Sequence, residues 1–238
     1  MYLDIILSKI TYIMENPVTP MKIFLDTADT EIINKHFATG LIDGVTTNPT
    51  LIRKSGRDPE DVYQELIDLG LGDISMEVGG NAIQMLGEGR RLYTKFGHHS
   101  TIKVPCTPEG LWVCKELHRD HIDVNVTLIF DAAQAILAAK AGAKYVSPFV
   151  GRLDDNSITG LDLITDIKHI YTVQRVHETQ ILSASIRYVN SVSQSFANGA
   201  DIVTMPPAVF EKMYNHVLTD KGLEIFNKDL EVIANENH

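Results

Sequence analysis

Short apolar runs rich in β-branched residues alternate along this chain with longer runs in which apolar residues recur every three or four positions. Short runs of this kind are typical of buried strands, and the longer ones are typical of amphipathic helices that cover a sheet. From Lys22 onward the alternation continues without a linker or a low-complexity segment. The pattern predicts eight strands, at residues 22–26, 43–47, 73–78, 101–105, 123–129, 145–149, 181–185 and 201–205.

A helical run follows each predicted strand, and one further run comes after the last unit. Two of these runs open with clear start signals, Asp58-Pro59 and Thr107-Pro108, because proline suits the first turn of a helix and the residue before it can cap that turn. The predicted helices cover residues 29–38, 58–69, 81–96, 108–119, 130–142, 158–175, 188–199, 207–217 and 221–234.

Repeated βα units predict a parallel sheet, and an unbroken row of eight favours a closed (β/α)8 TIM barrel; a doubly wound open sheet is the alternative. We assign residues 21–220 to one barrel domain and residues 221–238 to an added C-terminal helix and tail. The apolar stretch within residues 1–20 is interrupted by Asp4 and Lys9, and it has neither a basic start nor an A-x-A-like cleavage site. We therefore expect an N-terminal extension that is not a secretory signal and to which the sequence assigns no structure.

The composition narrows the class of protein. The chain has 238 residues, of which 44% are hydrophobic and 22% charged, as expected for a folded globular protein, and no apolar run is long enough to span a bilayer. The net charge of −10 argues against a nucleic-acid partner, which calls for a clustered basic surface. Cys106 and Cys114 match neither a disulfide framework nor C-x-x-C spacing, so we expect reduced thiols in a cytoplasmic protein.

Polar side chains gather near the carboxyl ends of the predicted strands, although a parallel strand covered on both faces should be continuously apolar. In a closed barrel these ends meet at one mouth, and side chains two apart on a strand share a face. An ordinary internal hydrogen bond could explain any one hydroxyl, but it does not explain the whole set. We therefore predict a functional site at this mouth, formed by Asp26, Thr46, Asn48, Glu77, Lys103, Asn125, Thr127, Ser147, Phe149, Ser183 and Ser185.

Lys103 is the most informative of these residues because it lies between Ile102 and Val104 in the fourth predicted strand. Burial favours the neutral form of a lysine amine, and the neutral amine attacks a carbonyl group to form an imine. Imine chemistry moves protons, which the carboxyl groups of Asp26 and Glu77 could carry. The alternatives are a lysine that snorkels to solvent or clamps a phosphate, and an ion pair of Lys103 with the carboxylates.

Arginine residues near the strand ends are candidates for phosphate binding. Arg152 and Arg187 would lie at the mouth, where the last loops of such barrels often hold phosphate. Arg90 and Arg91 are expected on a solvated helix face. No dinucleotide-binding or P-loop motif occurs, and the histidines lack metal-ligand spacing, so we predict neither a cofactor nor a metal.

The strand-end residues lie in six longer motifs: FLDTAD (24–29), GVTTNPTLI (44–52), IKVPCTPEGL (102–111), NVTLIF (125–130), AAKAGAKYVSPFVGRLDD (138–155) and SASIR (183–187). These motifs resemble the small transaldolases and the related fructose-6-phosphate aldolases, over essentially the whole of residues 21–230. The resemblance implies a (β/α)8 barrel with a class I mechanism and no cofactor. It also implies that the imine lysine on the fourth strand corresponds to Lys103.

The resemblance implies a role for each of the other site residues. Asp26 is similar to the residue that exchanges a proton with the substrate hydroxyl at the bond that breaks, and Glu77 with Thr127 resembles the pair that holds the catalytic water. The remaining positions resemble groups that bind substrate: Asn48 and Asn125 at the dihydroxyacetone part, Thr46 and Ser147 in the donor pocket, and Arg152, Ser185 and Arg187 at the phosphate.

Two positions bear on the branch of the family, one catalytic (Glu77) and one expected to bind substrate (Phe149). Aldolase-branch relatives typically have glutamine at position 77 and tyrosine at position 149, whereas this chain has Glu77 and Phe149 and follows the transferase pattern. Tyr188 departs from the family, in which asparagine is frequent after the arginine. The departure affects the finer shape of the expected phosphate site and leaves the chemistry unchanged.

The expected function is transfer of a dihydroxyacetone unit between sugar phosphates in the pentose phosphate pathway. The donor would be sedoheptulose 7-phosphate or fructose 6-phosphate, and the acceptor glyceraldehyde 3-phosphate or erythrose 4-phosphate. The alternatives are an aldolase that releases free dihydroxyacetone and a sugar-phosphate-binding barrel without catalysis. Small relatives assemble as decamers, and the last predicted helix is more apolar than an isolated exposed helix would be, so we expect it to pack on a neighbouring subunit of a homo-oligomer.

Overall fold

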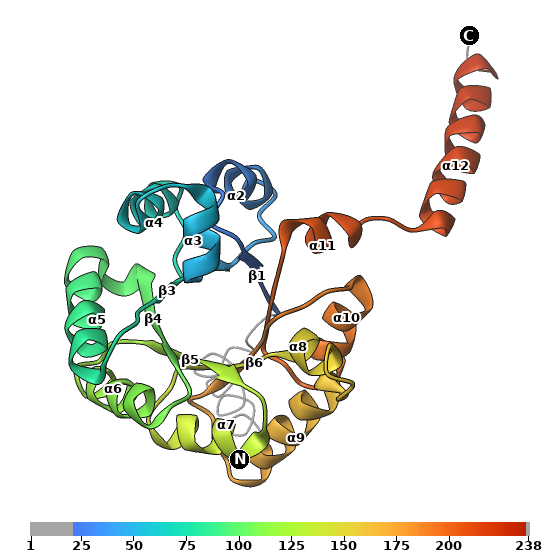
Figure 1. Cartoon of the computed structure of the whole chain (residues 1–238). Helices are drawn as coiled ribbons and strands as arrows, with labels where there is room; N and C mark the ends of the chain where they lie inside the picture. Colours follow the sequence, from blue (N-terminus) through green and yellow to red (C-terminus); the bar gives the residue numbers. More distant parts are fainter. Residues whose placement is uncertain (1–20, 237–238) are drawn as a thin grey trace, which may run out of the picture.

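The computed structural model of the chain describes residues 21–236, which form a closed barrel of eight parallel strands surrounded by helices (Figure 1). The strands follow one another around the barrel in chain order, and pairing of the last strand with the first closes it. The predicted (β/α)8 barrel is therefore confirmed, and the open sheet is ruled out. The strands are β1 (Lys22–Asp26), β2 (Gly44–Thr46), β3 (Ile74–Glu77), β4 (Ser100–Pro105), β5 (Val124–Ile129), β6 (Tyr145–Pro148), β7 (Gln180–Ser183) and β8 (Ile202–Met205).

Helices cover the outer face of the barrel. The start signals act as the sequence predicts: Asp58 Oδ1 accepts from the Glu60 amide at 2.9 Å, and Thr107 Oγ1 accepts from the Gly110 amide at 3.1 Å. The helices are α2 (Thr30–Phe37), α3 (Pro49–Ser55), α4 (Pro59–Asp68), α5 (Ala82–Phe96), the 3₁₀ turn η1 (Gly97–His99), α6 (Pro108–Arg119), α7 (Ala132–Lys140), α8 (Val150–Asp154), α9 (Gly160–Val173), α10 (Val189–Ala197), α11 (Pro207–Lys212) and α12 (Val217–Glu236).

Two apolar regions stabilise the barrel. The larger one lies between the strands and the helices and includes side chains such as Leu25 and Ile102 that have no exposed surface. The smaller one fills the inside of the barrel and consists of Phe24, Tyr145, Leu182, Ala184 and Ile202. Position 44 is glycine because the Phe24 ring occupies the space of its side chain: a Cβ there would lie 2.6 Å from Phe24 Cζ. Side chains thus close the lower part of the barrel, as in other barrels of this class.

A network of polar and charged side chains closes the amino-terminal end of the barrel. Asp73 Oδ1 accepts from the Thr101 hydroxyl at 2.8 Å, and its Oδ2 accepts from the Tyr145 hydroxyl at 2.6 Å. Lys144 Nζ lies 3.0 Å from Asp73 Oδ2 and 2.7 Å from Asp123 Oδ2. Burial and the neighbouring Asp73 carboxylate raise the pKa of Tyr145, so its hydroxyl stays a donor. Each of these side chains therefore has a partner.

The structure corrects several boundaries that the pattern predicts. The helices α3 and α8 lie in βα loops, and with seven and five residues they are too short for a helical period to appear. Strands β2, β6 and β7 end before Thr47, Phe149 and Ser185 respectively. The predicted helix at 207–217 ends at Lys212, and the last helix begins at Val217 instead of residue 221.

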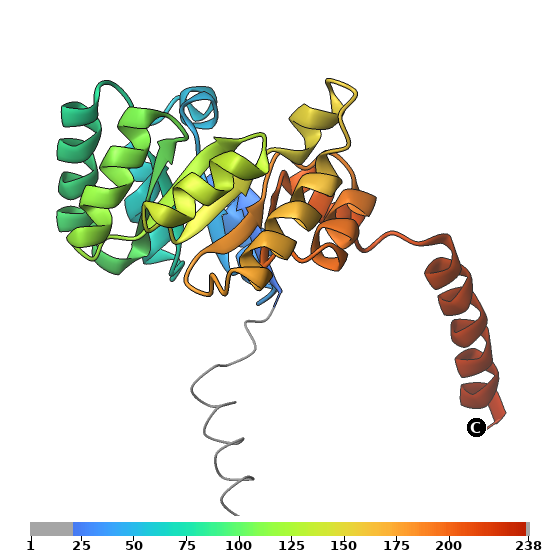
Figure 2. The same cartoon turned by 90° about the horizontal axis from the view of Figure 1, so that it is seen from below.

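Helix α12 leaves the barrel and extends away from it, as Figures 1 and 2 show from two directions. Its apolar side chains are exposed, with exposed fractions of 66% for Leu218, 66% for Phe226 and 62% for Leu230. Residues 1–20 and 237–238 lie outside the described residues, so the assignment of an N-terminal extension stays a prediction. Within the described part of the chain, no helix combines the length and apolar character needed to cross a membrane.

Candidate active site

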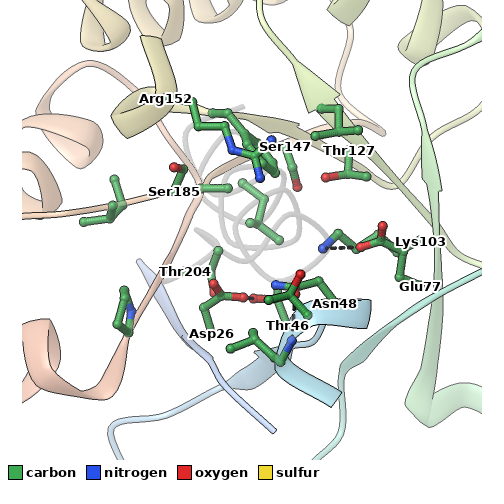
Figure 3. Close-up of a pocket in the computed structure, with 18 of the residues that line it drawn as sticks. Asp26, Thr46, Asn48, Glu77, Lys103, Thr127, Ser147, Arg152, Ser185 and Thr204 are labelled. Atoms are coloured by element: carbon green, nitrogen blue, oxygen red, sulfur yellow. Dashed lines mark hydrogen bonds and ion pairs between the residues drawn. The ribbon is translucent and has the colours of Figure 1, made fainter. Parts of the chain in front are cut away.

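A cavity of about 470 Å³ opens at the carboxyl-terminal mouth of the barrel. Figure 3 shows that its polar side chains come from strands and βα loops on all sides and point toward a common centre. Eleven of the twelve residues to which the resemblance gives a role or a branch assignment line this cavity: Asp26, Thr46, Asn48, Glu77, Lys103, Thr127, Ser147, Phe149, Arg152, Ser185 and Arg187. The twelfth, Asn125, lies in the layer below. The sequence therefore predicted most of the polar side chains of the lining.

Lys103 lies on β4 with only 6% of its surface exposed. Its Nζ lies 3.0 Å from Glu77 Oε2 and donates to the Thr47 carbonyl oxygen at 3.0 Å. The ion pair follows from the strand register, which sets Glu77 on β3 directly beside Lys103. An ammonium group has three donors, and these two contacts leave one for a ligand in the cavity. The ion pair that the sequence allowed as an alternative is present, and it is compatible with a role in chemistry.

Asp26 ends β1 on the other side of the cavity from Lys103 and Glu77 (Figure 3). Its Oδ1 accepts from the Thr46 hydroxyl at 2.8 Å. Burial raises the pKa of Asp26, and this effect exceeds the lowering by the Lys103 charge and by the Thr46 hydrogen bond. A carboxyl group with a raised pKa is suited to taking up and returning a proton.

Asn48 caps the short helix α3 at the edge of the cavity. Its Oδ1 accepts from the Leu51 amide at 3.0 Å, while its backbone is extended with φ −153°. Because the side-chain oxygen is occupied by the cap, the amide nitrogen is the part left to contact a ligand. Pro49, Thr50 and Leu51 of the same helix also line the cavity. The unpredicted helix α3 therefore orients a predicted site residue.

Thr127 lies where β5 departs from regular pairing. The register between β5 and β6 shifts between Val126 and Ile129, and Leu128 has a φ of 60° in the left-handed region. The Thr127 hydroxyl is buried and has no hydrogen-bond partner among the described residues. A buried, unpaired hydroxyl is costly, so it marks a position for a water molecule or a substrate group.

The amide of Asn125 is fully buried below the cavity. Its Oδ1 accepts from the Ser147 hydroxyl at 2.7 Å, and its Nδ2 donates to Ser75 Oγ at 3.2 Å. Ser147 itself lines the cavity. The structure therefore connects Asn125 to the cavity through Ser147.

Two arginines lie at one rim of the cavity. The Arg152 guanidinium lies over the Phe149 ring, 4.9 Å from its centroid, and no carboxylate in residues 21–236 lies within ion-pair distance of it. Arg187 Nη2 lies 3.0 Å from Asp155 Oδ2 at the exposed end of α8. Position 151 is glycine because a Cβ there would lie 2.1 Å from the Ser185 carbonyl oxygen and 2.9 Å from Arg187 Cγ.

Ser185 forms part of the same rim, with a φ of 60° in the left-handed region. Strained backbone at a serine persists where the surrounding structure requires a particular side-chain direction. Tyr188, the departure from the family pattern, is 70% exposed and does not line the cavity. The arginines predicted on a helix face, Arg90 and Arg91, lie on α5 and pair with Asp120, Glu60 and Glu88 at the surface.

One predicted residue is wrong, and nine of the twenty lining residues are absent from the prediction, among them the polar Thr50 and Thr204. Ser183 points outward and hydrogen bonds to Ser195 Oγ of α10 at 2.9 Å, so it belongs to the packing of the helix layer. Thr204 of β8 lines the cavity and lies 2.6 Å, oxygen to oxygen, from the Thr46 hydroxyl. The signal for Thr204 was available, because a threonine interrupts the apolar strand at residues 201–205.

The predicted absence of a metal stays a prediction. In the described residues, no three histidine, cysteine, aspartate or glutamate side chains are grouped so that they could hold a metal ion.

Cys106 and Cys114 are free thiols, and burial raises the pKa of Cys114 to about 12.

The fold and the site define a class of protein, a (β/α)8 barrel with a buried lysine, two carboxyl groups and two arginines at its carboxyl-terminal mouth. The sequence profile of the family described as Transaldolase/Fructose-6-phosphate aldolase matches residues 23–238. The chain therefore belongs to this family of enzymes.

Relatives in this family are similar over nearly the full length of both chains. A probable transaldolase of Nitrosopumilus maritimus is 49% identical over 218 residues, which cover 91% of this chain and 98% of the relative. A probable transaldolase of Caulobacter vibrioides is 51% identical over 210 residues, which cover 88% and 96%. A probable transaldolase of Hyphomonas neptunium is 53% identical over 210 residues, which cover 88% of this chain and 96% of the relative.

A solved structure of more distant sequence has the same fold. Thiamine phosphate pyrophosphorylase from Pyrococcus furiosus matches with a TM-score of 0.53 and 13% sequence identity, over 78% of this chain and 85% of that one. At this identity the likeness concerns the barrel alone.

Proposed function

We propose that this chain is a transaldolase that moves a dihydroxyacetone unit through an imine at Lys103. The donor is a ketose phosphate, sedoheptulose 7-phosphate or fructose 6-phosphate, and the acceptor is an aldose phosphate, glyceraldehyde 3-phosphate or erythrose 4-phosphate, as in the pentose phosphate pathway. One observation carries the proposal: Lys103 is a nearly buried lysine at the barrel mouth, flanked by Glu77 and facing the carboxyl group of Asp26. The names of the relatives support it.

The first half of the reaction breaks the donor. The neutral amine of Lys103 adds to the ketone carbon, and loss of water gives a protonated imine. The Asp26 carboxylate then takes the proton of the hydroxyl group on the second carbon from the imine carbon, and the bond between that second carbon and the carbon next to the imine breaks. Its electron pair moves to the imine, which becomes an enamine, and the shortened aldose phosphate leaves.

The second half reverses these steps with another aldehyde. The enamine carbon attacks the acceptor aldehyde, and Asp26 returns its proton to the new hydroxyl group. Water then hydrolyses the imine and releases the lengthened ketose phosphate and the Lys103 amine. The raised pKa of Asp26 suits a group that must both accept and give back the proton.

Glu77 and Thr127 are suited to the steps that add and remove water. Glu77 Oε2 lies 3.0 Å from Lys103 Nζ, so a water molecule held by Glu77 would be next to the imine carbon. The buried Thr127 hydroxyl, which has no partner among the described residues, supplies a second contact for that water. This pair therefore acts as the proton carrier for carbinolamine formation and hydrolysis.

The phosphate of the substrate binds at the arginine rim. Arg152 has no carboxylate partner within the described residues, and Arg187 and Ser185 lie beside it on the cavity wall. Arginine binds phosphate oxygens through two donors at once, which also orients the sugar. The dihydroxyacetone end then reaches Lys103 between Thr46, Asn48 and Ser147.

Borohydride trapping tests the covalent step. The intact mass is measured after reduction in the presence of fructose 6-phosphate for the wild type, Lys103→Met and Lys144→Met. Lys144 is a matched control because it is a partly buried, ion-paired lysine at the other end of the barrel. We expect the mass of a reduced dihydroxyacetone imine on the wild type and on Lys144→Met, and none on Lys103→Met. Turnover by Lys103→Met would contradict the mechanism.

The same assays separate the alternatives. Without an acceptor aldehyde, a transaldolase stops after the first half-reaction with the three-carbon unit still bound to Lys103, whereas an aldolase continues to release dihydroxyacetone. Glu77 and Phe149 follow the transferase pattern, so we expect the first result. Absence of an adduct on the wild type, under conditions that trap a known imine enzyme, would favour the sugar-phosphate-binding barrel without catalysis.

We also propose a cytoplasmic homo-oligomer, with a decamer as the family precedent. Helix α12 extends from the barrel with exposed Leu218, Phe226 and Leu230, an apolar surface that association would cover. Light scattering of the full chain and of a chain that ends at residue 216 tests this proposal. A monomeric full chain would contradict it.

A further inference from the structure

Thr204 has no role in the reaction described above, although its hydroxyl contacts the threonine that hydrogen bonds to the proton-accepting carboxyl group. Thr204 is on β8 and Thr46 is on β2, the two strands that flank β1, which carries Asp26. The hydroxyl oxygens of Thr204 and Thr46 are 2.6 Å apart, and the Thr46 hydroxyl is 2.8 Å from Asp26 Oδ1. Figure 3 shows the three side chains together, across the cavity from Lys103.

The direction of these hydrogen bonds follows from the number of hydrogens. A carboxylate can only accept, and a hydroxyl group has one hydrogen to donate. When Asp26 is ionised, Thr46 donates its hydrogen to Oδ1, so the hydrogen between the two threonines must come from Thr204. Both threonines are buried, with exposed fractions of 3% and 2%, so bulk water does not compete strongly for these bonds. The donors form one chain from Thr204 through Thr46 to Asp26.

We propose that Thr204 is a positioning residue for the proton transfer, acting through Thr46 to stabilise the ionised form of Asp26 and to fix its orientation. This inference rests on the proposed function. In a chain of hydrogen bonds, a group that donates to a hydroxyl makes that hydroxyl a better donor. When Asp26 holds the proton on Oδ1, the chain can reverse: Asp26 donates to Thr46, and Thr46 donates to Thr204. The heavy atoms need not move.

Three charged groups also act on Asp26, and the test must separate them from Thr204. These are Lys103 on β4, Glu77 on β3 and Arg187 after β7. None of them lies on the strands that flank β1. Substitution of Thr204 by an uncharged residue leaves their charges in place. A change in the pH dependence of the Thr204 variants therefore reports on the hydroxyl chain.

The experiment compares Thr204→Val, Thr204→Ala and Thr204→Ser with Thr101→Val. Thr101 is a matched control because it is also a buried threonine inside the barrel whose hydroxyl donates to an aspartate, Asp73, but at the other end. For each full-length variant we would measure kcat/KM from about pH 5 to pH 9, the rate at which borohydride traps the imine formed from free dihydroxyacetone, which requires no bond cleavage, and the Tm.

Loss of the hydroxyl makes the ionised Asp26 less stable, so the low-pH limb of kcat/KM moves to higher pH. We expect a shift of about half to one pH unit for Thr204→Val and Thr204→Ala. On the low-pH limb this shift lowers kcat/KM by about 3- to 10-fold, and the difference from the wild type becomes smaller as the pH rises. Thr204→Ser keeps the donor and should follow the wild type, as should Thr101→Val. Imine trapping at Lys103 should be unchanged in all variants, because Thr204 acts only on the later proton transfer.

Three results would overturn the role of Thr204. The first is a pH profile of Thr204→Val and Thr204→Ala that superimposes on the wild type. The second is a loss in Thr204→Ser as large as in Thr204→Val. The third is a decrease of imine trapping together with turnover, as expected from a general distortion. Failure of the proposed function is a different result, in which the wild type itself forms no imine.

Discussion

The two ends of the barrel use buried charge in opposite ways. At the amino-terminal end, Asp73 accepts from Thr101, Tyr145 and Lys144, and Lys144 also pairs with Asp123. Burial alone would lower the pKa of Lys144, but the Asp73 and Asp123 carboxylates outweigh it and raise that pKa. The charges at this end are mutually satisfied.

At the carboxyl-terminal mouth the polar groups are only partly satisfied. Burial raises the pKa of Asp26 because its protein partners do not compensate fully for the lost water. The Thr127 hydroxyl has no partner among the described residues, and Lys103 keeps one donor direction for a ligand. The difference indicates that the amino-terminal network contributes stability, whereas the polar groups at the mouth are left open to a ligand, as the proposed function requires.

The backbone conformation also differs between the two ends of the barrel. His121 and Arg175 have a positive φ just after α6 and α9, where a left-handed residue commonly ends a helix. Leu128 and Ser185 have a positive φ at the mouth, where no helix ends. Their strain is therefore tied to the direction of the side chains around the cavity.

The largest expected effect is that of Asp26→Asn. Loss of the proton acceptor should lower kcat by about 10²- to 10⁴-fold. The same change should raise the Tm at pH 7, because it removes a carboxylate that is costly to bury. The folded-state pKa of Asp26 is raised above 3.8, so ionisation reduces stability as the pH rises through the raised value. The difference in Tm between Asp26→Asn and the wild type should therefore be absent below about pH 4, increase as the pH rises, and be constant near neutral pH. Thermal unfolding of both proteins at several pH values checks this prediction.

Loss of both activity and stability in Asp26→Asn at pH 7 would contradict the comparison of the two ends. It would mean that Asp26 is as well compensated as Asp73.

A smaller effect, of opposite kind, is expected for Asp73→Asn at the amino-terminal end. This change leaves Lys144 with one carboxylate and weakens the acceptor of the Thr101 and Tyr145 hydroxyls. The pair is partly exposed, so we expect the free energy of unfolding to fall by about 2 kcal/mol. Activity per folded molecule should stay within about 2-fold of the wild type, because no atom of the network lines the cavity. Urea unfolding and steady-state kinetics measure the two quantities, and a selective loss of activity would be the contrary result.

The next effect concerns Arg152→Gln at the rim of the mouth. Loss of one charged phosphate contact should raise KM for a phosphorylated donor about 10-fold, with a smaller change in kcat. Stability should hardly change, because in residues 21–236 Arg152 has no ion-pair partner to lose. Kinetics with fructose 6-phosphate checks the prediction. A large decrease in kcat with an unchanged KM would place Arg152 in the chemical step instead.

The smallest effect is expected at the surface. Arg90 pairs with Asp120 at 2.7 Å, but both side chains are substantially exposed. Arg90→Gln should change the free energy of unfolding by less than about 0.5 kcal/mol and leave kcat and KM unchanged. A loss comparable with that of Asp73→Asn would show that burial does not govern the value of charge pairs in this barrel.

The alternation of short and long apolar runs was sufficient to predict the barrel, because each βα unit shows its own period of hydrophobic residues. It did not predict α3 and α8, since a helix of seven or five residues is too short to show a period. These helices matter for the site: Asn48 caps α3, and α8 carries Arg152.

The sequence by itself determined the strand order and which residue types lie at the mouth, because parallel strands in a βα series all end at the same side of a barrel. It therefore predicted Lys103, Asp26 and Glu77 together. The direction of each side chain was decided only by the tertiary structure. Ser183 faces α10, Asn125 lies below the cavity, and Thr204 points inward. Strand register, barrel closure and the irregularity in β5 select the face that each residue presents, and these depend on neighbours distant in the chain.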